Sequence, residues 1–588
     1  MTAFAVALVP GCPSGPRDAA PVPTAHDPVF AGRVTHVDAG PSAGAVITVS
    51  DAKDGNVLTV VRAEPDGRFV TKLPRGRYGV TAADATGWAY APLVDGSRGD
   101  VTIRLDSTCQ PYVGRIRTDT QLPADAVVQL GRQSQFTGDT FSAALSADGT
   151  FHTCLPAALY FVTPPPDLVP RISKLRVPAT SGVVYRTAPK ETADQAPADT
   201  SGLEPESEEQ FVARLPATIR LLGLAESNHG THEFYEERTS LVLRLANEQG
   251  VRLLLLEAGY GEVLVLDEYV NGATIDVDRA VQDLGYWVYD TKDFIAMLRR
   301  IREYNSKRTV ELRIHLIGFD VQDTMGCIKY LLQHAASAFP ADVSSALEKL
   351  SVKSGKAWTT LTSAQRTAIR ASLGGLAAAR GTGDASSESN RTMLAARTLL
   401  HRFDLLEVPS DNVSFMRDAA MAQMAIDILA TEPHSRATLW AHLGHLSRDY
   451  SVGDPPMGSY LASAFGDAYR VYALLAVRGS ARAWDEKGEI GVVAQPLRAA
   501  APGGLENVLA SRSGDAHVTY FTFADATGEV ARWLKGVHLL RSFGSAFIGE
   551  WENAYWNLEG IDGAILFDSV SPTEPTPTGE RHATPKTP

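Results

Sequence analysis

Two histidines and several charged side chains directly follow an apolar run near residue 220. The stretch GLAESNHGTHEFYEERTS, residues 223–240, places Glu226, His229 and His232 within seven positions, and Arg238 follows six residues later. Histidines and carboxylates gathered in one turn can exchange protons with a substrate, whereas a histidine just ahead of a helix can also merely cap it. From the spacing alone, a functional role and a capping role are both open for His229.

Further acid and base groups follow later apolar runs. Glu257 ends the run LLLLE, which should be buried, and a buried carboxylate is costly unless it has a partner. Asp320 ends another run, and His442 and His445 end a third. If these runs are parallel strands, their carboxyl ends meet at one edge of a sheet, where α/β proteins bind their ligands.

The elements that must position these residues alternate between strand and helix. Residues 220–226 and 251–259 have strand character, and residues 231–250 between them have helical periodicity. This order makes a βαβ unit, which favours a parallel sheet buried on both faces. Further candidate strands are residues 312–320, 436–445, 469–477 and 562–570.

A long helical stretch interrupts these strands. Residues from about 323 to 432 show few strand signals, so we expect a helical subdomain inserted over the edge of the sheet. The fold class predicted for residues 209–572 is therefore α/β, with a mostly parallel sheet flanked by helices and an inserted helical subdomain.

Two segments ahead of this region repeat. DGRFVTKLPRGRYGV (66–80) and DGTFHTCLPAALYFV (148–162) share eight residues in register, each reading as a turn, a strand, a proline turn and a second strand. The repeat predicts two small all-β sandwich modules at about 28–105 and 106–186. These resemble the carboxypeptidase-regulatory-like and Ig-like modules often found ahead of secreted bacterial catalytic domains, and they carry no convergent polar cluster.

The beginning of the sequence resembles a bacterial lipoprotein signal. MTAFAVALVPGC places a short apolar run before a glycine and Cys12. We expect residues 1–27 to be a signal-like segment and linker, with lipid on Cys12 attaching an exported protein to the cell envelope, or a periplasmic location. In such an oxidising compartment Cys109 and Cys154 are disulfide candidates, with two buried free thiols as the alternative.

Composition bounds the remaining possibilities. A chain of 588 residues should fold as several domains. The net charge of −13 and the lack of a Lys/Arg cluster argue against a nucleic-acid partner. No apolar run reaches the ~18–20 residues that a membrane span needs. Residues 187–208 are expected to be a linker, and the Pro- and Thr-rich residues 573–588 a disordered tail.

A series of short motifs runs in order through the second half of the chain: Gly223–Phe234, Glu257–Ala258, Asp267–Val270, Trp287, Asp290–Thr291, Tyr304–Asn305, Gly318–Asp320, Arg417–Asp418, Met421, Trp440–His442, His445, Met457–Leu461 and Phe567. Together these motifs resemble the erythromycin esterase family over about residues 210–570. The resemblance implies hydrolysis of a carboxylic ester or lactone, such as that of a macrolide antibiotic, without a metal or other cofactor.

The resemblance also implies roles for individual residues. The histidine at the place of His229 is the general base that activates water, and Arg238 or a protonated histidine would stabilise the oxyanion. We expect His232 and Asp320 to contact the substrate, which is a small molecule. Leu443 stands where the family commonly has asparagine, which bears on macrolide specificity. The residues implied to line the catalytic cleft with His229 are Glu226, Glu257, Arg238, His442 and His445.

Two other functions are compatible with the same residues. The pairs His229/His232 and His442/His445 have His-x-x-His spacing, and with a neighbouring glutamate they could bind a divalent metal ion in a metal-dependent hydrolase. A non-catalytic, surface-anchored binding protein on the same scaffold is the second alternative.

Overall fold

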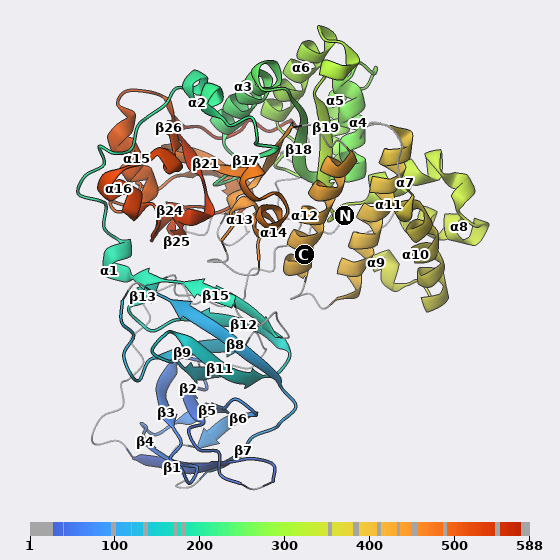
Figure 1. Ribbon diagram of the computed structural model, residues 1–588. Helices are drawn as coiled ribbons and strands as arrows, with labels where there is room; N and C mark the ends of the chain where they lie inside the picture. Colours follow the sequence, from blue (N-terminus) through green and yellow to red (C-terminus); the bar gives the residue numbers. More distant parts are fainter. Residues whose placement is uncertain are drawn as a thin grey trace. The chain divides into compact units, whose positions relative to one another are not determined.

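The computed structural model describes residues 28–577, apart from residues 39, 54, 96–100, 119, 133–138, 170–172, 178–182, 351–355, 380–386, 409–412, 432–435, 450–454, 486–490 and 547–552. The chain divides into two compact units, whose boundary lies between Ala193 and Asp194. The first unit is almost entirely β, and the second mixes helices and strands (Figure 1). The expected signal segment and Cys12 lie outside the described residues.

Each of the two predicted sandwiches in the first unit consists of a three-stranded and a four-stranded sheet. In the first sandwich the sheets are β4 (Arg68–Lys72), β1 (Val29–Thr35), β7 (Val101–Arg104) and β3 (Val57–Arg62), β2 (Val46–Asp51), β5 (Arg77–Ala83), β6 (Trp88–Asp95). In the second they are β11 (Thr150–Leu155), β8 (Gln110–Arg117), β15 (Val183–Arg186) and β10 (Thr140–Ala144), β9 (Val127–Arg132), β12 (Ala158–Thr163), β14 (Ser173–Val177). The unit ends with a short pair of strands and one helical turn: β13 (Leu168–Val169), β16 (Ala188–Pro189) and α1 (Lys190–Ala193).

The sequence repeat corresponds to a structural repeat. Gly67 and Gly149 precede β4 and β11 with φ of 82° and 80°, a left-handed conformation that glycine adopts at no steric cost. The hydroxyls of Tyr78 and Tyr160 each donate to the carbonyl oxygen of the proline four residues earlier. The prediction of two related β modules is confirmed.

A disulfide links Cys109, just before β8, to Cys154 in β11, with 5.4 Å between their Cα atoms. Of the two alternatives that the sequence left open, the structure has the disulfide. Cys327, in the second unit, is a buried free thiol.

The second unit is built on an eight-stranded sheet. Its order is β19 (His315–Asp320), β18 (Val251–Gly259), β20 (Arg436–His442), β17 (Leu221–Glu226), β21 (Tyr469–Trp484), β26 (Gly563–Val570) and β23 (Val518–Thr522), with β22 (Val492–Pro496) paired to β21. The first six of these strands run parallel, whereas β23 and β22 pair antiparallel. A separate hairpin joins β24 (Val537–Arg541) to β25 (Asn553–Asn557). The predicted α/β class is confirmed.

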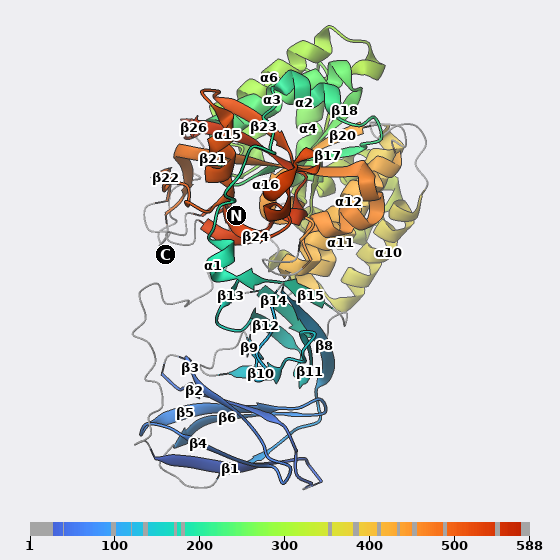
Figure 2. The ribbon, with the colours of Figure 1, turned by 60° about the vertical axis from the view of Figure 1, so that its left-hand side comes forward.

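Alternate residues of β17 show why the sheet is buried on both faces. Leu221 and Ala225 pack into one hydrophobic core, and Leu222 and Leu224 pack into the other. A strand covered on both sides needs this unbroken apolar run. Figure 2 shows α3 (His232–Glu248) and α6 (Lys292–Ser306) on one side of the strands and α11 (Glu388–Glu407) and α12 (Val413–Thr431) on the other. The remaining helices of the unit outside the insertion are α2 (Glu208–Arg214), α4 (Tyr260–Val270), α5 (Val277–Asp283), α13 (Leu443–Leu446), α14 (Met457–Phe465), α15 (Leu505–Ser513) and α16 (Gly528–Trp533).

The predicted helical insertion lies between β19 and β20. It consists of α7 (Met325–His334), α8 (Ala341–Leu350), α9 (Lys356–Thr359), α10 (Ser363–Ala378), α11 and α12, and its described residues contain no strand. Its apolar side chains join the same core as Leu221, so the insertion packs on one face of the sheet. In the part of the chain that the structure describes, no helix is long and apolar enough to cross a membrane.

The expected linker is largely packed onto the second unit. Within residues 194–208, Leu203 is fully buried in the core, and Glu206 pairs through its backbone with Tyr520 of β23. Composition alone suggested a free segment, because it does not show that a sheet edge is available to satisfy these backbone groups.

The first residues of the expected tail are hydrogen-bonded to the second unit. The Thr573 N–H donates to the carbonyl oxygen of Gly230, and the buried Thr576 hydroxyl donates to Asp290. Residues 571–576 therefore fasten the turn before α3 to the turn before α6. Residues 578–588 lie outside the described part of the chain.

Candidate active site

Four neighbouring strands bring most of the predicted site residues to one edge of the sheet. Glu226 of β17 and His442 of β20 stand directly opposite each other in the parallel register. Glu257 lies near the end of β18, the other neighbour of β20, and Asp320 ends β19. The carboxyl ends of parallel strands are where loops leave the sheet and ligands bind, as the sequence predicted.

His229 lies in the turn between β17 and α3, and Glu226 orients its ring. The His229 Nδ1 is 2.6 Å from Glu226 Oε1. An ionised carboxylate only accepts hydrogen bonds, so Nδ1 carries the hydrogen, and Nε2 of the neutral ring keeps its lone pair. Burial alone would raise the pKa of Glu226, but Arg238 and His229 outweigh it and hold that pKa below its ordinary value. The His229 side chain is 15% exposed, so water can reach it.

Arg238 supports this pair from behind. Its guanidinium forms an ion pair with Glu226, and its Cζ lies 3.4 Å from the centroid of the Trp440 ring. The Nε of Arg238 donates to the carbonyl oxygen of Phe234. With only 2% of its surface exposed, Arg238 positions Glu226 and is shielded from any substrate. Arg238 lies in the second turn of α3 and reaches back from there to the end of β17.

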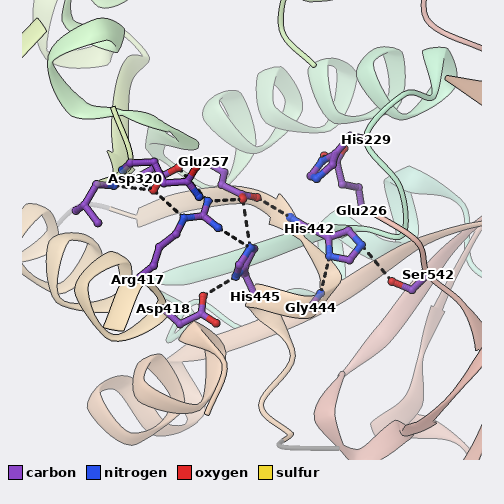
Figure 3. Close-up of polar contacts among 12 residues, drawn as sticks. Glu226, His229, Glu257, Asp320, Arg417, Asp418, His442, Gly444, His445 and Ser542 are labelled. Carbon is purple, nitrogen blue, oxygen red and sulfur yellow. Dashed lines mark hydrogen bonds and ion pairs between the residues drawn. The ribbon is translucent and has the colours of Figure 1, made fainter. Parts of the chain in front are cut away.

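A second cluster is organised by Arg417 of α12. Its guanidinium bonds Glu257 Oε1 at 2.8 Å and Asp320 at 2.9 and 3.0 Å, and its Nη1 lies 3.2 Å from His445 Nε2 (Figure 3). His445, on the short helix α13 after β20, bonds Asp418 through Nδ1 and lies 3.3 Å from Glu257 through Nε2. Two basic side chains, Arg417 and His445, thus lie next to each other among three carboxylates at the strand ends.

The charges of this second cluster reinforce one another. Burial alone would lower the pKa of His445, but Asp418 and Glu257 outweigh it and raise the pKa to about 10, so the ring is an imidazolium at neutral pH. Burial likewise opposes ionisation of Glu257, yet His445 and Arg417 hold its pKa well below the ordinary value. Glu257 also accepts the backbone N–H of His442 at 3.0 Å, so this buried carboxylate has the partners that its position requires.

The ring of His442 is neutral, whereas that of His445 is charged. Burial, with the neighbouring His229 and His445, lowers the pKa of His442 to about 3, which makes the ring neutral. Its Nδ1 accepts the N–H of Gly444 at 3.1 Å, and its Nε2 lies 3.1 Å from Ser542 Oγ. The rings of His442 and His229 are 5.3 Å apart between centroids, so a neutral donor stands beside the candidate base (Figure 3).

Two residues expected to contact the substrate are engaged elsewhere. His232, the first residue of α3, bonds Asp293 of α6 through Nδ1, and its side chain is 38% exposed. Within the described residues, no hydrogen bond or ion pair joins His232 to His229 or His442. Asp320 is 2% exposed and is held by Arg417, so its geometry fits a partner of that arginine better than a substrate contact.

Sequence reasoning left three participants out of the site. Arg417 and Asp418 were noticed only as a motif, because nothing in the sequence of a helix about 160 residues after Glu257 indicates that it returns to the same edge. Their place in the same motif series as Glu257 and Asp320 was the available signal. Ser542 follows β24, a strand that the sequence did not predict, and it carried no signal.

The geometry also bears on metal binding. Within the described residues, no three histidine, cysteine or carboxylate side chains converge as metal ligands would. The carboxylates best placed to do so, Glu257 and Asp320, already have Arg417 between them. A metal ion would have to displace a buried guanidinium that both carboxylates hold.

The sheet, its two helical layers and the acid–base cluster at its carboxyl edge define an α/β protein with the site architecture of an enzyme. A family model described as erythromycin esterase matches residues 246–569, more than half of the chain. The chain belongs to the erythromycin esterase family, which supports a hydrolase of the esterase kind. The match begins at residue 246, so the turn that holds His229 and His232 lies outside the matched residues.

Solved structures share this fold at low sequence identity. A Bacillus cereus protein is 19% identical, with a TM-score of 0.55 over 64% of this chain and 97% of its own. A succinoglycan biosynthesis protein is 18% identical, with a TM-score of 0.54 over 66% and 98%. A variant of the erythromycin esterase EreC in its open conformation is 18% identical, with a TM-score of 0.44 over 63% and 96%.

Proposed function

We propose that this protein hydrolyses a carboxylic ester or lactone with a water molecule that His229 activates as general base. The observation that carries the proposal is the contact between Glu226 and Nδ1 of His229, which leaves Nε2 as the proton acceptor. As Nε2 takes a proton from water, the ring becomes an imidazolium, and the Glu226 carboxylate stabilises it. Arg238 keeps Glu226 ionised and fixed in place.

The second cluster supports the same reaction electrostatically. The attack of water on a carbonyl carbon moves negative charge onto the carbonyl oxygen, and preorganised positive charge lowers the energy of that state. His445 and Arg417 bring cationic donors to the same strand ends, but Glu257, Asp320 and Asp418 already balance their charge, so they contribute through the orientation of their N–H groups and not through net positive charge. Arg238, which we expected from the sequence to be able to serve here, is buried behind Glu226 and acts through it.

A panel of carboxylic esters and lactones, macrolides included, tests the proposal with the purified full chain and a His229→Ala variant. We expect turnover of at least one ester or lactone, and its loss in the variant. Activity that survives His229→Ala, or that EDTA removes and a divalent metal restores, would contradict water activation by this histidine. A macrolide is one candidate substrate in the panel.

We also propose that the protein works outside the cytoplasm. The Cys109–Cys154 disulfide supports this location, because such bonds persist in oxidising compartments. Alkylation of free thiols in freshly lysed cells, followed by mass spectrometry, measures the fraction that is oxidised. Membrane fractionation of the native chain and a Cys12→Ser variant tests attachment by lipid, and an unprocessed cytosolic protein with reduced Cys109 would contradict both expectations.

A further inference from the structure

The loop after β24 lies against both histidines of the proposed site. Ser542 Oγ is 3.1 Å from His442 Nε2, and the carbonyl oxygen of Gly544 accepts the backbone N–H of His229 at 3.3 Å. The Phe543 N–H donates to the carbonyl oxygen of Ser227 at 3.0 Å. The loop is therefore held beside both histidines, with the Ser542 side chain against His442.

The hydrogen bonds of His442 fix which atom of its ring carries the hydrogen. The Gly444 N–H can only donate, so Nδ1 of His442 keeps its lone pair. Since the ring is neutral, its single N–H hydrogen is on Nε2, where it faces the carbonyl oxygen of Ser227 at 3.3 Å and Ser542 Oγ at 3.1 Å. His442 is thus the donor in its contact with Ser542.

This assignment has two consequences for Ser542. With a hydrogen on Nε2, His442 has no lone pair there to take the serine proton, so it cannot activate Ser542 as a nucleophile. The hydroxyl hydrogen of Ser542 also has no acceptor among the described residues, because His442 is the only one of them that Oγ contacts. Ser542 is 8% exposed and accepts one hydrogen bond, which strengthens the hydroxyl as a donor.

We propose that Ser542 is a further catalytic residue, whose hydroxyl donates a hydrogen bond to the substrate carbonyl oxygen as that oxygen becomes negative. The inference rests on the proposed hydrolysis. His229 Nε2 takes one proton from water as the new C–O bond forms, and the carbonyl π electrons move to the oxygen that faces Ser542. The intermediate then expels the alcohol oxygen, which receives the proton from His229. No proton leaves Ser542.

Substitution of Ser542 separates this role from a structural one. Removing one preorganised oxyanion donor typically lowers kcat by ~10²–10³-fold, so we expect a loss of that order in Ser542→Ala with KM nearly unchanged. Ser542→Thr keeps a hydroxyl and should recover much of the rate. Ser545→Ala, in the same loop, is the matched control and should resemble the native enzyme.

A tetrahedral inhibitor supplies a readout that a packing defect would not move. A phosphonate monoester that mimics the intermediate should bind Ser542→Ala more weakly by the same factor by which kcat/KM falls. Unchanged turnover in Ser542→Ala overturns the inference while leaving the proposed function standing. An acyl group found on Ser542 by mass spectrometry also overturns it. A native enzyme that hydrolyses no member of the ester panel contradicts the proposed function itself.

The ring assignment can be measured without any reaction. In protein labelled with ¹⁵N-histidine, the His442 signals, identified by their loss in His442→Gln, should show a hydrogen on Nε2 and a bare Nδ1 at pH 7. A hydrogen on Nδ1 would make Ser542 the donor to His442 and would overturn the inference whatever the enzyme hydrolyses.

Discussion

Two turns with the same His-x-x-His spacing give their histidines different states. After β17, His229 and His232 both have a carboxylate on Nδ1, Glu226 and Asp293 respectively. After β20, His445 has the carboxylate of Asp418 on Nδ1. Of these four histidines, only His442 accepts a backbone N–H at Nδ1, that of Gly444.

The difference shows that the partner on Nδ1 and the surroundings, not the spacing, set what each ring can do. A carboxylate on Nδ1, with no contact to Nε2 among the described residues, suits His229 to the proposed role of base. Carboxylates at both nitrogens make His445 a cation, since Glu257 faces its Nε2. An N–H on Nδ1 makes the buried His442 a neutral donor. A shared metal site would have required the four rings to act alike.

The largest expected effect on kcat is at His229, the proposed base of the first turn. His229→Ala should lower kcat by ~10²–10⁴-fold, the usual contribution of a general base, while thermal unfolding remains near that of the native protein. His229→Gln should be as damaging, because an amide cannot take a proton at neutral pH. Steady-state kinetics on the best ester of the panel measure both, and a folded His229→Ala enzyme with near-native kcat would refute the assignment.

Asp418→Asn should convert the cation of the second turn into a neutral ring at alkaline pH. Without this carboxylate only Glu257 still opposes the effect of burial, so the pKa of His445 falls from about 10. Because a raised histidine pKa acts only while the ring is protonated, its contribution is lost as pH rises through that pKa. We expect near-native kcat at pH 6 and a loss of ~10-fold or more at pH 9.

The pH profile of kcat from pH 6 to 10 is the measurement for Asp418→Asn. Its alkaline limb should move to lower pH than in the native enzyme. Asp427, nine residues further along α12, offers a control, since Asp427→Asn removes a carboxylate that pairs with Arg397 and not with His445. A uniform loss at all pH values in Asp418→Asn would show that Asp418 matters through packing instead.

His442→Gln should be tolerated better than His229→Gln. A glutamine keeps a neutral N–H donor that can face Ser542, whereas the lost contacts of the ring are single neutral hydrogen bonds worth ~0.5–1.5 kcal/mol each. We therefore expect kcat within about tenfold of the native value. A loss as large as that of His229→Gln would mean that the ring of His442 takes a proton during turnover, and the comparison between the two turns would fail.

The fold could be predicted from the sequence wherever the apolar pattern was continuous. The runs ending at Glu226, Glu257 and Asp320 are strands because only strands buried on two faces need such unbroken apolar residues. The predicted strand 436–445 was too long, since β20 ends at His442 and one helical turn follows. Short strands such as β23 and β24, with five residues each, gave too little pattern to be found.

The site was predictable only in part, for a different physical reason. Strand-end residues could be placed because parallel strands share an edge, which brings Glu226, Glu257 and His442 together without knowledge of any side-chain contact. Arg417 comes from the far end of the insertion, and no local pattern encodes where such a helix packs. The protonation state of each histidine could not be predicted either, since it depends on whether Nδ1 contacts a carboxylate or a backbone N–H.

The smallest effect is expected at His232, the member of the first turn that lies outside the cluster. Burial disfavours its imidazolium, but Asp293 outweighs this and raises its pKa above the ordinary value. The side chain is 38% exposed, so solvent screens the pair, and exposed ion pairs are worth only ~0–1 kcal/mol. His232→Gln should therefore change kcat by less than about threefold and the unfolding free energy by less than ~1 kcal/mol. By the sign of the shift, that small stabilisation exists at low pH and fades as pH rises above the raised pKa, so urea denaturation at pH 5.5 and 9 should show the difference only at the lower pH. A drop in kcat comparable to that of His229→Ala would show that His232 takes part in the reaction. The His-x-x-His spacing would then matter more than the partner of each ring.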